Sequence, residues 1–268
     1  MAVDLSKRSG DATVSLLKHL TTAQASGHDL GEVTAQVVLV FDHSASMRPF
    51  YDRGDVQELT ERVLGLSLPL DDDGQIQVFP FDHQAYEPFT VDANTYPGVI
   101  DRWRQGDTVA SDAPQPARRR FFGGRVTSNT TTQPTARPRQ MGGTDYSPVI
   151  DAVLKFAKSE GMLRAGQPPV FVLFQTDGGT EHAQAAQDRL VAAAKLPIFW
   201  QFLGLGSNTS FLSVLDNLPG RVVDNVGLTS VPSVNGTDPV EFYDRVTEEF
   251  VTKWIPAARA AGIIRDQS

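Results

Sequence analysis

Five oxygen-bearing side chains, spread over three short motifs, have the chemistry to bind a hard metal ion. They are Asp42, Ser44 and Ser46 in a D-x-S-x-S pattern, Thr144 after a Gly-Gly pair, and Asp177 in a T-D-G motif. Two carboxylates and three hydroxyls, with no thiol among them, match the ligands that Mg²⁺, Ca²⁺ and Mn²⁺ prefer. With water completing the shell, they suit one six-coordinate divalent cation. We expect Mg²⁺, with Ca²⁺ or Mn²⁺ as alternatives.

The first and third motifs directly follow sequences typical of strands buried on both faces. Residues 36–42 read QVVLVFD, and residues 169–176 read PVFVLFQT. Short continuous runs of apolar and β-branched residues favour central strands of a parallel sheet. Parallel strands bring their carboxyl ends to one edge of the sheet, where ligands bind in open α/β folds. We therefore expect the three motifs to converge at that edge.

Strands and helices alternate along most of the chain. Further strands are predicted at 75–81, 85–89, 197–203 and 221–226, and helices at 54–68, 181–195, 208–217 and from 238 onward. Another helix is expected to be capped by Ser147 and to end at Gly161, and Pro256 is expected to kink or stop the last one. This alternation predicts an α/β fold with a doubly wound, mostly parallel central sheet and helices on both faces.

Two segments depart from this alternation. Residues 1–35 are predicted to form an N-terminal arm packed on a domain spanning 36–262, and 14–20 (VSLLKHL) suits a short strand or a helical turn. Residues 105–140 are predicted to be an exposed, flexible insertion. Its part from 113 to 140 holds six Arg and no Asp or Glu. It is either a solvated insertion or a basic arm for an acidic partner or a phosphate-bearing ligand.

Composition restricts the class of protein. The chain has 268 residues, of which 40% are hydrophobic and 21% charged, and its formal net charge is −8. That charge argues against general binding to nucleic acid or anionic membranes. No apolar run reaches the ~18–20 residues of a bilayer span, and the first residues lack a signal-peptide pattern. Cysteine is absent, which excludes disulfides and thiolate metal sites. A cytoplasmic location fits these features.

The order of the three motifs after their apolar strands resembles the metal-ion-dependent adhesion site (MIDAS) of von Willebrand factor A (vWA) domains. All five positions match that pattern. The stretches DHSASM, MGGTDYSPV and PIFWQFLGLG further resemble the vWA domain of TerF-type tellurium-resistance proteins. The basic insertion departs from that pattern.

The resemblance implies a role for each matching residue. The hydroxyls of Ser44, Ser46 and Thr144 would contact the metal directly, and Asp42 and Asp177 would bind it partly through water. Neutral hydroxyls leave the cation under-neutralised, so that a carboxylate from a protein partner can complete its shell. The function implied is a metal-dependent protein-interaction module, and not an enzyme, in a bacterial stress or tellurium-resistance system.

Two other functions are open to the same residues. A Mg²⁺-dependent phosphoryl-transfer enzyme of the haloacid-dehalogenase type also places Asp at a strand end. It needs a second Asp two residues later, where this chain has Ser44, and a nearby Lys, which no motif supplies. A metal-free scaffold domain would need a ligand position to be missing, and none is. Neither serine lies in a G-x-S-x-G nucleophile motif.

Overall fold

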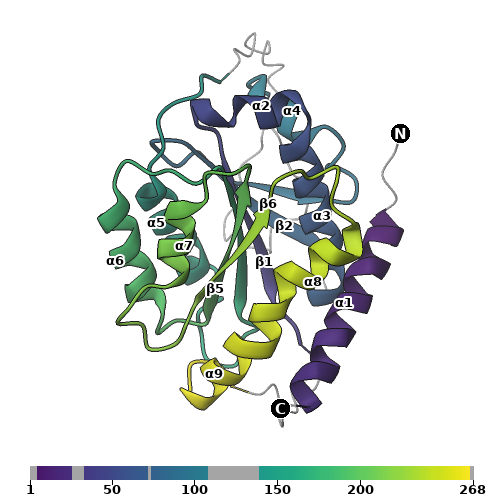
Figure 1. The fold of residues 1–268 in the computed structure, drawn as a ribbon, viewed down its shortest axis with the longest axis vertical. Coiled ribbons are helices and arrows are strands. Elements are labelled where there is room, and N and C mark those ends of the chain that lie inside the picture. The colour runs from purple at the N-terminus through teal and green to yellow at the C-terminus, as the bar shows by residue number, and fades with distance from the viewer. Residues whose placement is uncertain (1–4, 26–32, 72–73, 108–138, 266–268) are drawn as a thin grey trace, which may run out of the picture.

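The computed structural model describes residues 5–25, 33–71, 74–107 and 139–265 (Figure 1). These form one sheet with the strand order β3-β2-β1-β4-β5-β6. The strands are β1 (Gln36–Asp42), β2 (Gln75–Phe81), β3 (Phe89–Asp92), β4 (Val170–Thr176), β5 (Ile198–Leu205) and β6 (Val226–Val231). Every neighbouring pair is parallel except β2 and β3. The predicted α/β fold with a mostly parallel sheet is therefore confirmed. Most of the predicted insertion lies outside the described residues.

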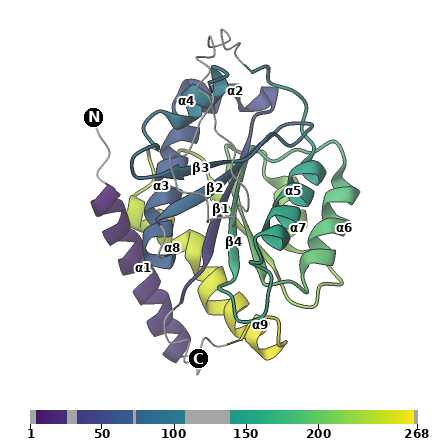
Figure 2. The ribbon, with the colours of Figure 1, turned by 180° about the vertical axis from the view of Figure 1, so that it is seen from behind.

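Helices cover both faces of this sheet (Figures 1 and 2). One face is covered by α5 (Tyr146–Ser159), α6 (Ala183–Ala193) and α7 (Ser210–Asp216). The other carries α1 (Leu5–Ala25), α3 (Asp55–Leu70), α8 (Pro239–Glu249), the π-helix η2 (Phe250–Trp254) and α9 (Ile255–Ala260). Three short elements, the 3-10 turn η1 (Ala45–Met47), α2 (Arg48–Asp52) and α4 (Val99–Arg104), lie toward the carboxyl end of β1. No helix in the described ranges combines the length and apolar character of a membrane span.

Burial on both faces explains the apolar sequence of β1. Leu39 and Phe41 belong to the core beneath α3 and α8, whereas Val38 and Val40 belong to the core beneath α5 and α6. Successive side chains of a strand point to opposite faces, so a central strand covered on both sides needs apolar residues at every position. After Gln36 at its start, the strand therefore has no polar side chain until Asp42 at its carboxyl end.

Three local predictions were wrong in detail. The 14–20 segment is neither a short strand nor a single turn but part of the 21-residue helix α1. The strand predicted at 221–226 begins only at Val226, because the Arg221 side chain donates to the Asp216 and Leu218 carbonyls at the end of α7 and holds this segment there. The strand predicted at 85–89 is displaced to β3.

Two helix-end predictions also need correction. The cap of α5 is Asp145 and not Ser147, because the Asp145 carboxylate accepts a hydrogen bond from the Ser147 N–H at 2.9 Å. Of the two outcomes expected at Pro256, the stop is wrong, because the chain stays helical past this residue, and the kink stays a prediction. A π-helical turn precedes this proline, which cannot donate the usual backbone hydrogen bond. The predicted cap at Asp238 is confirmed, with hydrogen bonds from Val240 N and Glu241 N.

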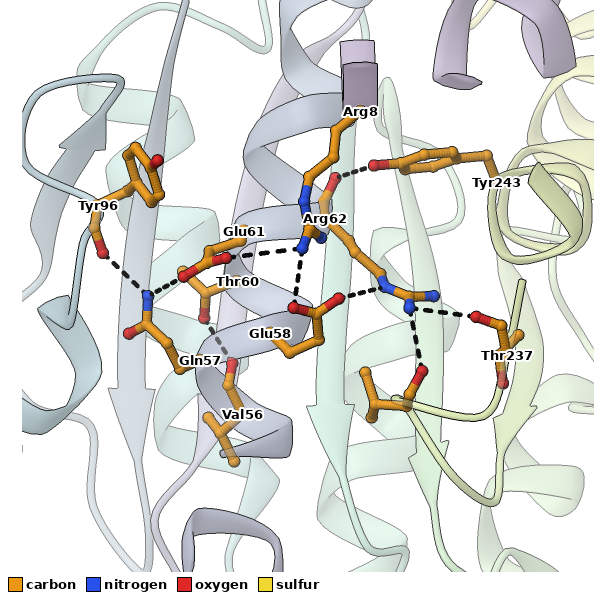
Figure 3. A network of polar contacts seen from close by, with 11 residues as sticks. Arg8, Val56, Gln57, Glu58, Thr60, Glu61, Arg62, Tyr96, Thr237 and Tyr243 are labelled. Carbon is orange, nitrogen blue, oxygen red and sulfur yellow. Dashed lines mark hydrogen bonds and ion pairs between the residues drawn. The ribbon is translucent and has the colours of Figure 1, made fainter. Parts of the chain in front are cut away.

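The N-terminal helix α1 packs against α3 and α8 and is tied to them by a polar network (Figure 3). Arg8 of α1 donates to a Glu58 carboxylate oxygen at 2.8 Å, and Arg62 donates to the other oxygen at 3.0 Å. Arg62 also donates to the carbonyls of Val234 and Thr237 at 3.0 and 3.2 Å. Burial would raise the pKa of Glu58, but the two arginines lower it below its ordinary value. The network therefore joins three segments that are far apart in the sequence.

Removing Arg62 should destabilise the fold more than removing an exposed cation. Its side chain is 4% exposed, so Arg62→Met removes one partner from the half-buried Glu58 carboxylate and the donor from two backbone carbonyls. We expect urea unfolding to show a loss of about 2–4 kcal/mol in the free energy of unfolding. The matched control Lys253→Met removes a 69%-exposed partner of Glu249 and should cost less than about 1 kcal/mol. Equal losses would contradict this role of the network.

Candidate metal site

Asp42, the last residue of β1, lies buried at the bottom of the site. Its carboxylate accepts one hydrogen bond from the Ser44 backbone N–H and one from the Thr176 hydroxyl, each at 2.7 Å. Burial raises the pKa of Asp42 to about 7, although the hydrogen bonds from Ser44 and Thr176 oppose this and the charge of Asp177 adds to it. A carboxyl group in this state favours a nearby positive charge, because such a charge stabilises its ionised form.

The serine loop after β1 runs beside the Gly-Gly-Thr loop. The Ala45 N–H donates to the Gly142 carbonyl at 2.9 Å, and Ser44 and Gly142 form a parallel β-bridge. The Ser44 and Ser46 hydroxyl oxygens lie 3.2 Å apart. Two hydroxyls this close can bind one small cation together. The first two motifs are therefore joined through the backbone.

Gly142 has no room for a side chain. A Cβ atom at this position would lie 2.4 Å from His83 Nδ1 and 2.6 Å from the Asp82 carboxylate. The Asp145 N–H also donates to the Asp82 carbonyl at 2.9 Å, which holds the start of α5 against the end of β2. Glycine is needed here for close packing, since its φ is not positive.

The third loop, after β4, is attached to the second. The Glu181 N–H donates to the Thr144 carbonyl at 2.8 Å, and the Tyr146 N–H donates to the Thr180 hydroxyl at 3.3 Å. Gly178 has φ 114°, and a Cβ there would lie 1.9 Å from the Asn208 carbonyl oxygen. The T-D-G motif thus requires its glycine both for backbone conformation and for space. All three loops are connected by hydrogen bonds.

The loops surround a cavity of about 290 Å³ at the carboxyl edge of the sheet. Its lining residues are Ser44, Ala45, Ser46, Gly142, Gly143, Thr144, Gly179, Thr180 and Glu181. Three of the five predicted ligands are therefore in the wall. The other two are not: Asp42 is fully buried and holds the serine loop from behind, and Asp177 is half-buried beside the lining residues.

The donor set fits a hard cation better than a soft one. Within the described residues, no three His, Cys, Asp or Glu side chains are grouped as a metal site, so hydroxyls must provide much of any coordination here. His43 directly follows the predicted ligand Asp42 in the sequence, but its side chain is not among those that line the cavity. Its ring lies 5.0 Å from the Trp103 ring and 5.5 Å from the Tyr51 ring, and burial lowers its pKa to about 4.

A comparison with protein families decides which family this fold and site belong to. Residues 34–264 match the vWA-TerF-like family, described as the vWA found in the TerF C terminus. The chain belongs to this family. A relative from Bacillus subtilis (strain 168), "Uncharacterized protein YcbR", is 30% identical over 257 residues, which cover 96% of this chain and 92% of that protein. The resemblance seen in the motifs is confirmed.

Solved structures of mussel byssus proximal thread matrix protein 1 share the vWA fold. Crystal form 2 has a TM-score of 0.52 at 17% identity, covering 82% of this chain and 49% of that one. A structure of the same protein with a zinc-occupied MIDAS motif has a TM-score of 0.51 at 16% identity, covering 82% and 48%. The vWA-TerF-like chain thus spans about half the length of these mussel chains.

The sequence analysis assigned no role to two residues that the structure brings to the site, one of which is the threonine of the T-D-G motif. Thr176 donates to the Asp42 carboxylate, and Glu181 lines the cavity. Thr176 could have been noted, because it occupies the last position of a buried strand where an apolar residue is expected. Glu181 gives no such signal, because an acidic residue just before a helix is ordinary.

Asp42 should make the metal-free protein less stable as pH rises. Its folded pKa of about 7 exceeds the ordinary 3.8, so the folded state holds this proton more tightly than the unfolded state. The proton's stabilising contribution is complete below about pH 3.8 and disappears as pH rises through about 7. Asp42→Asn keeps the shape and has no proton to lose. We expect urea unfolding in EDTA to show that the free energy of unfolding of Asp42→Asn, relative to that of wild type, rises by about 2–4 kcal/mol between these two pH values. A difference independent of pH would contradict the assignment.

Proposed function

We propose that this vWA domain binds one divalent cation in the cavity and, through it, a carboxylate of a protein partner. The observation that carries the proposal is the convergence of the Ser44, Ser46 and Thr144 loops around a cavity backed by the buried Asp42 carboxylate. These side chains come from three loops connected by hydrogen bonds, so little conformational freedom remains to be lost when an ion binds.

Each residue has a separate task in this proposal. Ser44, Ser46 and Thr144 offer neutral hydroxyl oxygens at the cavity wall, while Asp42 and Asp177 supply negative charge from behind it. The family pattern assigns the hydroxyls to direct contact and the carboxylates to contact partly through water. A bound divalent cation would place a positive charge near the Asp42 carboxylate. A coordination position left open on this cation would take the partner's carboxylate.

This arrangement suits the binding of a partner better than the catalysis of a reaction. A phosphatase of the haloacid-dehalogenase type needs a second Asp two residues after the first, and this chain has Ser44 there. No Lys or Arg is among the lining residues to hold a phosphate. His43 is buried between aromatic rings and cannot serve as a base for a group in the cavity. The domain therefore acts in this proposal as an interaction module and not as a phosphoryl-transfer enzyme or a metal-free scaffold.

Mg²⁺ is the proposed cation, with Ca²⁺ or Mn²⁺ as alternatives. The cavity wall offers oxygen donors, the chain has no cysteine, and the His43 side chain is not among those that line the cavity. Zinc is reported for the MIDAS motif of the mussel protein, but nitrogen or sulfur ligands, which zinc prefers, are not among the lining side chains here.

The family name supports a cellular setting for the interaction. We assign the domain to a bacterial stress or tellurium-resistance-type system, in the cytoplasm. Its partner would be acidic, because it supplies a carboxylate to the metal and because the Arg-rich segment 113–140 precedes the Gly-Gly-Thr loop in the sequence. Charge contacts between a basic segment and an acidic partner act mainly on the association rate.

Binding of the cation should stabilise the protein through Asp42. At one hundred times the dissociation constant, Mg²⁺ or Mn²⁺ should add about 2.7 kcal/mol to the free energy of unfolding. Thermal unfolding of wild type should shift upward with metal and return with EDTA, whereas Asp42→Asn should not respond. Asp52→Asn, at an exposed position on α2, is the matched control and should respond like wild type. Identical metal responses of the two Asn variants would refute the site.

Partner binding should depend on the metal, and its rate of association should depend on the basic segment 113–140. Immobilised wild type should retain its partner with Mg²⁺ and release it with EDTA, because the metal forms part of the contact. Replacing Arg118, Arg119, Arg120, Arg125 and Arg137 by Ser should slow association several-fold at low salt and hardly at high salt. Surface plasmon resonance across a salt series measures this. Association that is unchanged at low salt would leave the segment without a role in binding.

A further inference from the structure

Glu181 is fastened to the Gly-Gly-Thr loop by both its backbone and its side chain. Its N–H donates to the Thr144 carbonyl at 2.8 Å, and its carboxylate accepts a hydrogen bond from the Thr144 N–H at 3.3 Å. Although Glu181 is an exposed residue, its carboxylate is therefore folded back over the loop that carries a proposed ligand. An exposed glutamate with no such contact would extend into water.

The carboxylate also fills space that only a glycine leaves open. A Cβ atom at Gly143 would lie 2.1 Å from Glu181 Oε1. The backbone at Gly143 does not have a positive φ, so it would accept another residue as far as its conformation is concerned. The second glycine of the loop thus creates room for this carboxylate group.

Among the described residues that line the cavity, Glu181 is the one with a charged side chain. It shares that wall with Ser44, Ser46 and Thr144, whose hydroxyls are neutral. A divalent cation bound to neutral hydroxyls attracts any carboxylate within reach, and carboxylate oxygens are the ligands that such ions prefer. Glu181 has three rotatable side-chain bonds and is already at the cavity, so it needs only a change of rotamer to reach an ion there.

We propose that Glu181 is a ligand of the cation supplied by the chain itself, and that it occupies the coordination position that a partner's carboxylate takes. The proposal rests on the metal site proposed above. Glu181 then strengthens metal binding and weakens partner binding, because a partner must displace it. The domain would exist in a closed state, with Glu181 on the ion, and an open state that accepts a partner. Removing Glu181 shifts this population toward the open state.

The number of water molecules on the bound ion distinguishes this proposal from a purely structural role. Terbium luminescence lifetimes in H₂O and D₂O count the inner-sphere waters of Tb³⁺ bound in place of Mg²⁺. Glu181→Ala should add at least one water relative to wild type, and its Mn²⁺ dissociation constant should rise by roughly tenfold. Sodium acetate, as a probe carboxylate, should remove the additional water from Glu181→Ala at concentrations that leave wild type unchanged.

Two further variants complete the experiment. Gly143→Ala places a methyl group where the carboxylate lies in the metal-free structure, so it removes this resting position but leaves the ion-bound rotamer open, and its water count should equal that of wild type. Glu160→Ala is the matched control, because this exposed glutamate follows the far end of α5, about 20 Å from its start at the site. It should behave like wild type.

The outcomes separate the two proposals. Normal metal binding with the same water count in wild type and Glu181→Ala would overturn the role of Glu181 and leave the metal site standing. Absence of Tb³⁺ and Mn²⁺ binding by wild type would overturn the metal site itself. A melting temperature of metal-free Glu181→Ala equal to that of wild type would show that its effect is on the ion and not on the fold.

Discussion

The hydrogen bond from the Thr176 hydroxyl to the Asp42 carboxylate is the contact on which the site depends. It joins the carboxyl ends of β1 and β4, the two central strands, at 2.7 Å and in a fully buried position. A buried carboxylate is costly unless its oxygens are hydrogen-bonded, and here Ser44 N satisfies one oxygen and Thr176 the other. The same two contacts fix where the serine loop leaves β1. The Asp42 carboxylate and the serine hydroxyls are therefore positioned by the same two hydrogen bonds.

The three loops are attached to one another mainly through backbone groups. Ala45 N binds the Gly142 carbonyl, and Glu181 N binds the Thr144 carbonyl. Such contacts are independent of most side chains, but the loops that make them need glycine at two positions. A Cβ at Gly142 would meet the Asp82 and His83 side chains, and one at Gly178, where φ is positive, would meet the Asn208 backbone carbonyl. The glycines in the second and third motifs are thus part of the site's construction, although they bring no ligand atoms.

The central part of the fold was predictable because its constraints are local. Strands buried on both faces must be apolar throughout, so β1 and β4 are visible in the sequence, and the polar residue that follows each one marks the ligand edge. The start of α5 was harder to predict, because Asp145 and Ser147 are both good caps, and the choice depends on the contact between Asp145 N and the Asp82 carbonyl. Long-range contacts of this kind also place Glu181, and no spacing rule reveals them.

Charge is balanced differently in the two polar regions of the molecule. In the network between α1 and α3, Glu58 is neutralised by Arg8 and Arg62, so its acidic charge is balanced within the fold. At the carboxyl edge of the sheet, by contrast, the described residues include no lysine or arginine paired with Asp42, Asp177 or Glu181, and burial keeps the pKa of Asp42 near 7. Under the proposed function, a divalent cation from solution would relieve this imbalance. The fold thus pairs the charges that hold its helices together, whereas the acidic side chains at the loop edge have no lysine or arginine partner among the described residues.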